Sequence, residues 1–279
     1  RAEAELFREE NLALETQKSK LDLEFDKLIG AQTVEWNGEE RTLRQMLPVL
    51  LEQDRDLREK AWRLMADRQL QDRSALNDLW ARYMDIRRKI ADNADMSDYR
   101  AYQWKAMHRF DYSPKDAETF QNAIEEVVVP AARRIYEKKR ARLGVDSLRP
   151  WDTAVDPDGK PPLKPYNSTQ ELMDGMTRMF GEVDPALGSY FQTMRDEDLL
   201  DLENRKGKAP GGYCTDLPLA KRPFIFMNSV GLHDDVQTLL HEGGHAFHAF
   251  EALKLPYTQQ QEPPMEFAEV ASMSMELLG

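Results

Sequence analysis

The segment TLLHEGGHAFH, Thr238–His248, limits the fold of this chain more than any other segment does. The spacing of its first two histidines brings both side chains to one point only if the segment is a helix. On an α-helix, His241 and His245 lie one turn apart on the same face, so both imidazoles can reach a single metal ion at roughly 2.0–2.1 Å. Glu242 is rotated around the helix, which places its carboxylate beside a water on that ion. The spacing therefore predicts a helix with two metal ligands and one proton acceptor.

The sequence around this segment favours the same helix. Residues 234–255, DDVQTLLHEGGHAFHAFEALKL, have helical periodicity, and Asp234 and Asp235 suit the positive N-terminal end of a helix. Gly243 and Gly244 lie inside it, where each glycine costs about 1 kcal/mol of helix stability relative to alanine. We therefore expect the backbone of another element to pack closely against this turn.

The order H-E-x-x-H is typical of zinc-dependent peptide hydrolysis. Zinc lowers the pKa of a bound water from about 15.7 to about 7, and an adjacent carboxylate takes the proton as the water attacks a peptide carbonyl. The competing interpretation is a chance pair of histidines on a surface or core helix. A strand-like run, PFIFMNS at residues 223–229, favours the zinc interpretation, since an edge strand beside the metal can hydrogen-bond an extended peptide.

His248 is the third histidine of the segment, and the spacing excludes it as the third ligand. The compact pattern H-E-x-x-H-x-x-G-x-x-H needs glycine where His248 stands and histidine where Glu251 stands. His248 also lies roughly 10 Å along the helix axis from His241, at about 1.5 Å per residue. We expect His248 to be a supporting, hydrogen-bonded histidine.

Glutamates downstream offer the missing ligand. The segment EPPMEFAEVASMSMELL, residues 262–278, begins with two prolines suited to a helix start, and its glutamates recur on roughly one face. These glutamates are Glu266, Glu269 and Glu276. Spacing alone leaves Glu266 and Glu269 as alternatives, and either would complete a two-histidine, one-glutamate site with the fourth position open for water.

Helical patterns dominate the rest of the chain and predict a mainly α fold. Helical patterns run through residues 1–28, about 43–95, about 98–110, about 114–143 and about 168–203. Asn37-Gly38 predicts a short β-hairpin, and Pro130 is expected to kink or divide the helix that ends near residue 143. Residues 148–167 carry five prolines and form the best domain boundary, which divides the chain into regions 1–150 and 151–279.

Composition argues against several other classes of protein. The chain has 279 residues, 41% of them hydrophobic, which is enough for a substantial core. The net charge of -12 argues against a nucleic-acid partner. No run approaches the roughly 18 apolar residues of a membrane span, and the first residues lack the apolar stretch of a signal peptide. The single cysteine, Cys214, suits a reducing compartment, so we expect a cytoplasmic protein without a membrane partner.

Two stretches together resemble one enzyme family. GLHDDVQTLLHEGGHAFH followed by EFAEVASMSMELL is similar to the thimet oligopeptidase and oligoendopeptidase F family of zinc metallopeptidases, especially its oligoendopeptidase F branch. The family has a downstream glutamate in an E-x-x-S context, which Glu269 and Ser272 match. The resemblance therefore implies Glu269 as the third ligand, with Glu266, Ser272 and Glu276 as supporting residues. RKGKAPGGYC resembles the family's glycine-rich segment near the substrate cleft, with Tyr213 as a substrate-contact candidate, and PFIFMNSVG resembles its substrate-side strand.

The resemblance covers most of the chain and implies its fold and activity. The implied fold is a mainly α, zincin-like (gluzincin) peptidase fold with a small β-sheet beside the metal helix. Residues 1–150 would form part of a channel wall, and residues 151–279 would hold one Zn²⁺ through His241, His245 and Glu269. Glu242 would be the general base for cutting internal bonds of short unfolded peptides. A metallocarboxypeptidase and a non-catalytic helical zinc-binding scaffold remain as alternatives.

One feature departs from the family pattern. Family members continue well past the third-ligand helix, whereas this chain ends at Gly279. Tyrosine and histidine side chains from that later part are expected to stabilise the oxyanion, and loss of one such donor costs roughly 100- to 1,000-fold in kcat. We therefore expect a missing C-terminal portion or a second chain to complete the catalytic apparatus.

Overall fold

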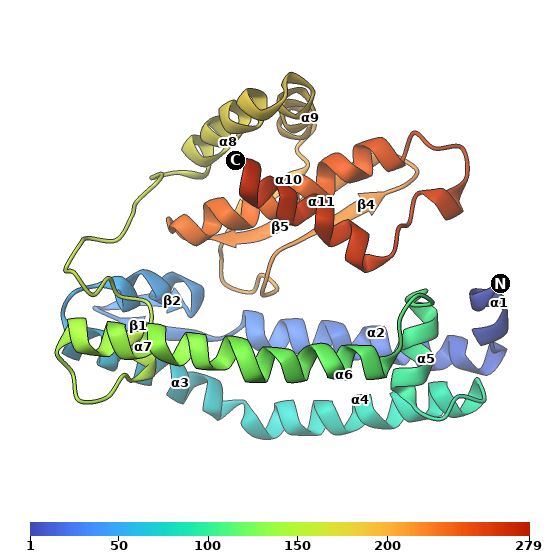
Figure 1. Ribbon diagram of the computed structural model, residues 1–279, viewed down its shortest axis with the longest axis horizontal. Coiled ribbons are helices and arrows are strands. Elements are labelled where there is room, and N and C mark those ends of the chain that lie inside the picture. Colours follow the sequence, from blue (N-terminus) through green and yellow to red (C-terminus); the bar gives the residue numbers. More distant parts are fainter. The chain divides into compact units, whose positions relative to one another are not determined.

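The computed structural model describes residues 1–279 as a mainly α-helical chain with two small β-sheets (Figure 1). The backbone packs into two compact units: residues 1–28 with 49–162, and residues 29–48 with 163–279. The division of function at residue 150 stays a prediction. The packing boundary lies at residue 162, in the proline-rich loop, and the hairpin segment packs with the later unit. None of the helices combines the length and the apolar character that crossing a bilayer requires.

The first unit consists of helices, the longest of which have roughly parallel axes and alternate in chain direction (Figure 1). They are α1 (Ala2–Leu6), α2 (Glu9–Gly30), α3 (Arg55–Gln71), α4 (Arg73–Asn93), α5 (Tyr99–Ala106), α6 (Pro114–Ala123) and α7 (Val129–Leu143), followed by the short 3-10 helix η3 (Pro150–Asp152). The core of this unit lies between α2 and α4. It is formed by Leu21, Leu79, Tyr83, Ile86 and Ile90, and the α4 members recur at the helical spacing of three and four residues.

Pro130 interrupts its helical stretch, as predicted, and does so through a π-helical turn. Residues Ile124–Val128 (η2) form this turn between α6 and α7, and the N–H of Val129 bonds the carbonyl of Ile124, five residues back. Proline has no N–H to donate, and its ring crowds the preceding turn of an α-helix. The wider π turn accommodates both effects without ending the helical run.

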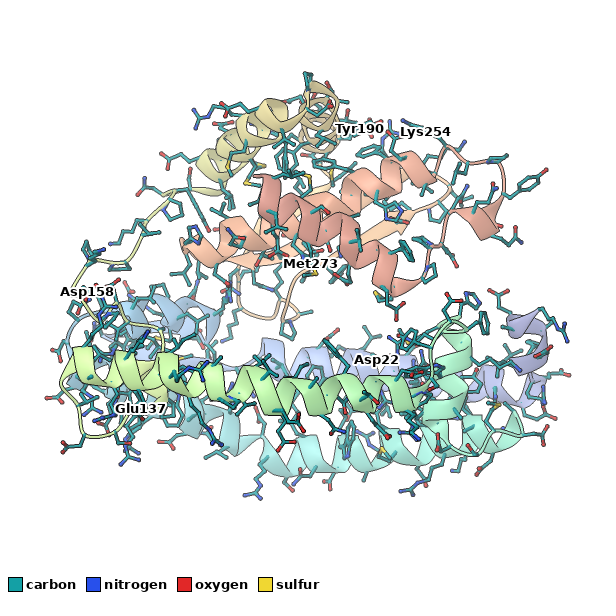
Figure 2. All side chains as sticks on the ribbon, viewed as in Figure 1. Asp22, Glu137, Asp158, Tyr190, Lys254 and Met273 are labelled. Atoms are coloured by element: carbon teal, nitrogen blue, oxygen red, sulfur yellow. The ribbon has the colours of Figure 1, made fainter.

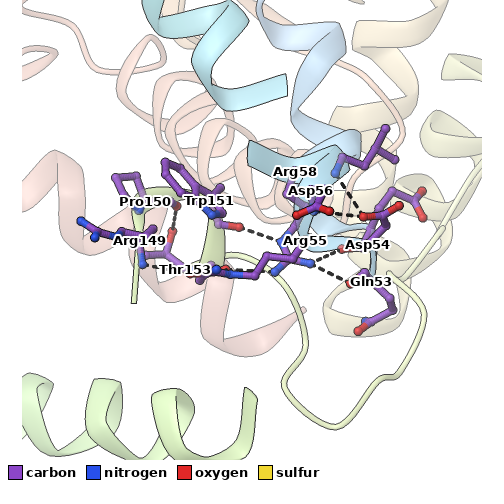
Figure 3. A network of polar contacts seen from close by, with 12 residues as sticks. Gln53, Asp54, Arg55, Asp56, Arg58, Arg149, Pro150, Trp151 and Thr153 are labelled. Carbon is purple, nitrogen blue, oxygen red and sulfur yellow. Dashed lines mark hydrogen bonds and ion pairs between the residues drawn. The ribbon is translucent and has the colours of Figure 1, made fainter. Parts of the chain in front are cut away.

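A buried ion-pair network ties the proline-rich loop to α3 (Figure 3). Asp152 is fully buried, and its carboxylate accepts bonds from Arg55 Nε (3.0 Å) and Nη2 (2.8 Å) and from Arg58 Nη2 (3.0 Å). The N–H of Arg149 donates to the same carboxylate at 2.9 Å, and Arg58 Nε donates to the carbonyl of Trp151 at 2.8 Å. Burial alone would raise the pKa of Asp152, but these hydrogen bonds outweigh burial and lower the pKa to about 2.

The second unit combines a β-hairpin, a three-stranded sheet and helices. Its elements are β1 (Thr33–Trp36), β2 (Glu39–Thr42), the 3-10 helix η1 (Arg44–Leu51) that leads into the first unit, α8 (Thr169–Val183), α9 (Pro185–Asp196), β3 (Leu200–Glu203), β4 (Tyr213–Leu217), β5 (Arg222–Ser229), α10 (His233–Ala252), the 3-10 helix η4 (Thr258–Gln260) and α11 (Met265–Leu278). The predicted Asn37-Gly38 hairpin is confirmed. These two residues have φ angles of 54° and 84°, as a two-residue hairpin turn requires.

The sheet has the order β3-β5-β4, with β5 parallel to β3 and antiparallel to β4. The run PFIFMNS forms a strand, as predicted, but it lies in β5 at the centre of the sheet. The prediction that this run borders the substrate as an edge strand is therefore wrong, because β4 occupies that edge. The prediction of helix as far as residue 203 is also wrong, because β3 pairs with β5, a partner that lies more than twenty residues later.

The metal-motif helix α10 lies at the centre of the second unit. It packs on β4 and β5 and contacts α8, α9 and α11 (Figure 1). The core around it includes Phe180, Phe191, Met194, Ile225, Leu239 and Leu240. At the surface, Lys254 Nζ donates to Tyr190 Oη at 2.6 Å, which ties α9 to the end of α10 (Figure 2). The helix is thus held on several sides, so its side chains have fixed positions.

Candidate metal centre

Facing turns of α10 and α11 bring His241, His245 and Glu269 together. Their ligand-type atoms all lie within 4.8 Å of one another. Glu269 Oε2 is 3.3 Å from His241 Nε2 and 3.7 Å from His245 Nε2. The two imidazole rings meet at 84°, with centroids 4.9 Å apart. Two imidazole nitrogens and a carboxylate oxygen therefore converge in the manner of a three-ligand metal site.

Two further side chains of α11 orient this group. Glu276 Oε1 lies 2.6 Å from His241 Nδ1, which leaves Nε2 of that ring directed at Glu269. Ser272 is fully buried, and its hydroxyl donates to Glu269 Oε2 at 2.9 Å. A carboxylate on the far nitrogen of a ligating histidine fixes the ring and makes it a stronger ligand. Glu266, by contrast, is exposed and lies outside the group.

The close approach of α11 to α10 depends on Gly244. A Cβ atom on Gly244 would lie 2.6 Å from Ser272 Cα and 2.7 Å from the carbonyl oxygen of Ala271. The expectation that another backbone packs against this turn is confirmed. Gly243 has a different neighbour, since a Cβ there would lie 2.6 Å from Cζ of Phe180. The missing side chain of Gly244 is what allows Glu269 to reach the histidines.

We expect Gly244→Ala to move α11 and lower metal affinity at least about tenfold, the lower end of what loss of an outer partner costs. The same overpacking should reduce stability by about 1–3 kcal/mol. Gly175→Ala on α8 is the matched control, because a Cβ there meets nothing within 4 Å. Zinc titration and urea unfolding measure both effects. Parent-like zinc affinity in a folded Gly244→Ala protein would contradict this account of the helix contact.

Glu242 lies beside the two histidines and reaches toward β4. It is only 7% exposed, and its carboxylate accepts the backbone N–H of Cys214. Burial raises the pKa of Glu242, and the charge of His241 acts in the opposite direction. Burial also lowers the pKa of His245, which favours the neutral imidazole that a metal needs. A shielded carboxylate therefore lies next to an imidazole, that of His245, whose neutral form is favoured.

A cavity of about 600 Å³ opens beside these groups. It is lined by Gly212, Tyr213, Cys214, Thr215, Asp216, His241, Glu242, His245, His248 and Glu269, among others. Tyr213 is 47% exposed, and its ring stacks on Phe226 of β5 with centroids 4.9 Å apart. His248 lines the cavity without belonging to the metal group. Tyr213 and His248 thus both line the cavity beside the metal-type group.

Sequence reasoning did not identify Cys214 or Asp216 as residues of the site. Cys214 contributes its backbone N–H to Glu242, and Asp216 lines the cavity. The segment that contains both, YCTDL, is short and largely exposed, and it becomes a strand by pairing with β5. No local pattern in the sequence marks such a strand, because its structure depends on that partner.

Comparisons with known proteins agree with the fold and the motif. Residues 49–279 match the model of Peptidase family M3. The chain is 28% identical over 140 residues to an oligoendopeptidase F homologue of Mycoplasma pneumoniae. It is 22% identical over 224 residues to the chromosomal oligoendopeptidase F of Lactococcus lactis subsp. cremoris. These matches cover 49% and 73% of this chain, but only 22% and 35% of those proteins.

Two solved structures extend the comparison over nearly the whole chain. A candidate oligoendopeptidase F from Bacillus anthracis has a TM-score of 0.93 and 28% identity, and covers 99% of this chain and 50% of that one. PZ peptidase A with an inhibitor has a TM-score of 0.93 and 30% identity, and covers 99% and 49%. The chain therefore spans about half the length of these solved relatives. The predicted mainly α peptidase fold is confirmed, and because the family model matches more than half of its residues, this chain belongs to peptidase family M3.

Proposed function

We propose that this chain carries the metal-binding part of a zinc-dependent endopeptidase that hydrolyses internal bonds of short oligopeptides. The observation behind the proposal is the convergence of His241, His245 and Glu269 beside the buried carboxylate of Glu242. These groups line a cavity next to a free strand edge. Membership of family M3 and similarity to oligoendopeptidase F support the peptidase class.

The donor set fits zinc. Two histidine nitrogens and one glutamate oxygen make a typical catalytic zinc site, which keeps its fourth position open. The lowered pKa of His245 favours a neutral ring nitrogen there, and Glu276 at Nδ1 of His241 leaves Nε2 of that ring directed at Glu269. When bound there, zinc supplies Lewis acidity, which polarises a peptide carbonyl and lets water lose a proton near neutral pH.

Glu242 is the proposed general base. Burial raises its pKa, so the carboxylate is a better proton acceptor than an exposed glutamate. It accepts a proton from the attacking water and, as a carboxylic acid, then donates that proton to the nitrogen of the leaving amine. The N–H of Cys214 orients the carboxylate from β4. The proton acceptor and the strand that would align the substrate are therefore fixed to each other.

We propose that the peptide binds in extended form along β4. One edge of this strand pairs with β5 from Tyr213 to Leu217, and the other edge has no strand partner. Backbone hydrogen bonds to a free edge require an extended, unfolded peptide and depend little on its side chains. This geometry supports short unfolded peptides as substrates, with Tyr213 beside the bound chain.

Digestion of a short peptide blocked at both ends tests this function. Because solved relatives are about twice as long as this chain, the assay uses the protein expressed from its complete reading frame. We expect two complementary internal fragments by mass spectrometry, loss of cleavage with a chelator, and recovery with added zinc.

Two results would contradict the proposal. Resistance of the blocked peptide, with stepwise loss of C-terminal residues from an unblocked one, would indicate a metallocarboxypeptidase. Zinc binding without hydrolysis of either peptide would indicate a non-catalytic zinc-binding scaffold.

A further inference from the structure

Lys208 is a buried cation in the segment between β3 and β4. Its side chain is only 1% exposed. Its Nζ lies within hydrogen-bond distance of four oxygens: Asp201 O and Oδ1 at 2.9 Å each, Glu203 O at 2.9 Å and Met227 O at 2.6 Å. A buried ammonium is costly unless its hydrogens are bonded and a counter-charge is near. Lys208 meets both conditions, so its position is well defined.

The oxygens around Lys208 lie where the sheet is irregular. The pairing register between β3 and β5 shifts between Asp201 and Glu203. Lys208 bonds the carbonyls of these two residues and that of Met227 on β5. The ammonium therefore joins both strands at the register shift and fixes the start of the segment that leads to β4.

The rest of this segment is held by backbone contacts. Gly207 N–H donates to the carbonyl of Gly30 at 2.9 Å, and a Cβ on Gly30 would lie 2.6 Å from the carbonyl oxygen of Lys208. Asn228 Nδ2 donates to the carbonyls of Ala209 and Gly211, at 2.9 Å each. Residues 207–211 are thus fixed from both sides just before β4 begins.

Lys208 also acts on the cavity wall through an aromatic stack. Its Nζ lies 4.4 Å from the ring centroid of Phe226, and that ring stacks against Tyr213. Tyr213 lines the cavity, and Lys208 does not. Any effect of Lys208 on a bound peptide must therefore pass through β4 and Tyr213.

We propose that Lys208 is a positioning residue for peptide binding: its buried ammonium sets the path of residues 205–212 and so the placement of Tyr213 and the free edge of β4. The inference rests on the proposed peptidase function of the cavity. It assigns Lys208 to substrate binding, separately from the metal ligands and the proton acceptor.

Lys208→Met tests the proposal, because methionine keeps the length and apolar volume of the stem and removes the ammonium. The full-length, zinc-loaded protein is used with the end-blocked peptide. We expect KM to rise about tenfold or more while kcat changes less than about threefold, the pattern for lost binding that is shared by ground and transition states. Zinc content should stay at the parent value, and amide hydrogen exchange should accelerate over residues 209–217.

Lys206→Met is the matched control in the same segment. Lys206 is 60% exposed and pairs only with the exposed Glu40, so its loss should leave KM and exchange unchanged. Equal exchange and KM in the two variants would overturn the positioning role. Accelerated exchange in Lys208→Met with parent KM, or a fall in kcat alone, would also overturn it.

Two further outcomes are separable. If the parent binds zinc but cuts no peptide, the proposed peptidase function fails. Equal amide hydrogen exchange in the Lys208→Met and Lys206→Met variants would separately overturn the ordering of β4 by Lys208. If Lys208→Met does not fold, Asn228→Ala removes the two bonds to residues 209 and 211 instead. A folded Asn228→Ala protein with faster exchange at these residues and parent KM would overturn the inference.

Discussion

Glu242→Gln is expected to lower kcat for peptide hydrolysis by about 10²–10⁴-fold, the range for loss of a general acid–base group. Glutamine keeps the shape of the side chain but cannot accept a proton from water. Because Glu242 is only 7% exposed, buffer molecules have little access to take over its role. Zinc content should not change, because the metal group consists of other residues. Steady-state kinetics and metal analysis on one preparation measure both quantities.

Glu251→Gln is the control for this experiment. Glu251 lies on the same helix, but its carboxylate is exposed and bonds Tyr190 and Lys254 at the surface. Its variant should keep the parent kcat. Activity in Glu242→Gln within about threefold of the parent would rule out Glu242 as the proton acceptor, given the size of acid–base effects.

Asp152→Asn is expected to destabilise the first unit by about 3–5 kcal/mol, the cost of removing one partner from a buried ion pair. Asp152 has no exposed surface, and Arg58, its partner, is only 3% exposed in its side chain. Asparagine would leave the guanidinium of Arg58 buried without a counter-charge. Because Arg55 and the backbone N–H of Arg149 bond the same carboxylate, the proline-rich loop should also loosen from α3 (Figure 3).

The pH dependence follows from the lowered pKa of Asp152. The carboxyl has a pKa of about 2 in the folded unit, below its value in the unfolded chain, so the folded state favours the ionised form. Its contribution is fully present above the unfolded pKa of about 3.9 and is lost as the pH falls toward the folded value. Urea unfolding from pH 6 downward should therefore show a steeper loss of stability in the parent than in Asp152→Asn.

Asp158→Asn supplies the comparison. This carboxylate lies in the same loop and pairs with Arg142, but 42% of its side chain is exposed (Figure 2). An exposed pair contributes about 0–1 kcal/mol, so the change should be small. Equal losses in the Asp152 and Asp158 variants would mean that the buried network has no special role in stability.

The metal helix and its histidine pair were predictable because the information is local. The spacing of His241 and His245 places both rings on one face within a single turn of any α-helix. The Asn37-Gly38 turn likewise depends only on its own two residues. Such features need no knowledge of distant parts of the chain.

The third ligand could not be chosen from spacing, because Glu266 and Glu269 lie on nearly the same face of α11. The difference arises from packing. Gly244 admits the backbone at Ser272, which sets Glu269 opposite the histidines and leaves Glu266 exposed. Only the resemblance to a known family implied Glu269 in advance.

The sheet order was equally beyond local reasoning. PFIFMNS was recognised as a strand from its composition, but whether a strand is central or at an edge depends on which other segments pair with it. The partners are β3 and β4, two short segments that no periodicity distinguishes from loop or helix. The role of Lys208 was hidden for the same reason, because its acceptors lie on two of these strands.

Zinc titration of the parent, Glu269→Gln and Glu266→Gln proteins against a competing chelator tests the proposed metal site. We expect one zinc ion per parent chain. We expect parent affinity in Glu266→Gln, and in Glu269→Gln a loss larger than the roughly 10- to 100-fold cost of losing an outer partner. Retained affinity in Glu269→Gln together with a loss of affinity in Glu266→Gln would contradict the assignment of His241, His245 and Glu269 as the metal site. A parent protein that binds no zinc would contradict it as well.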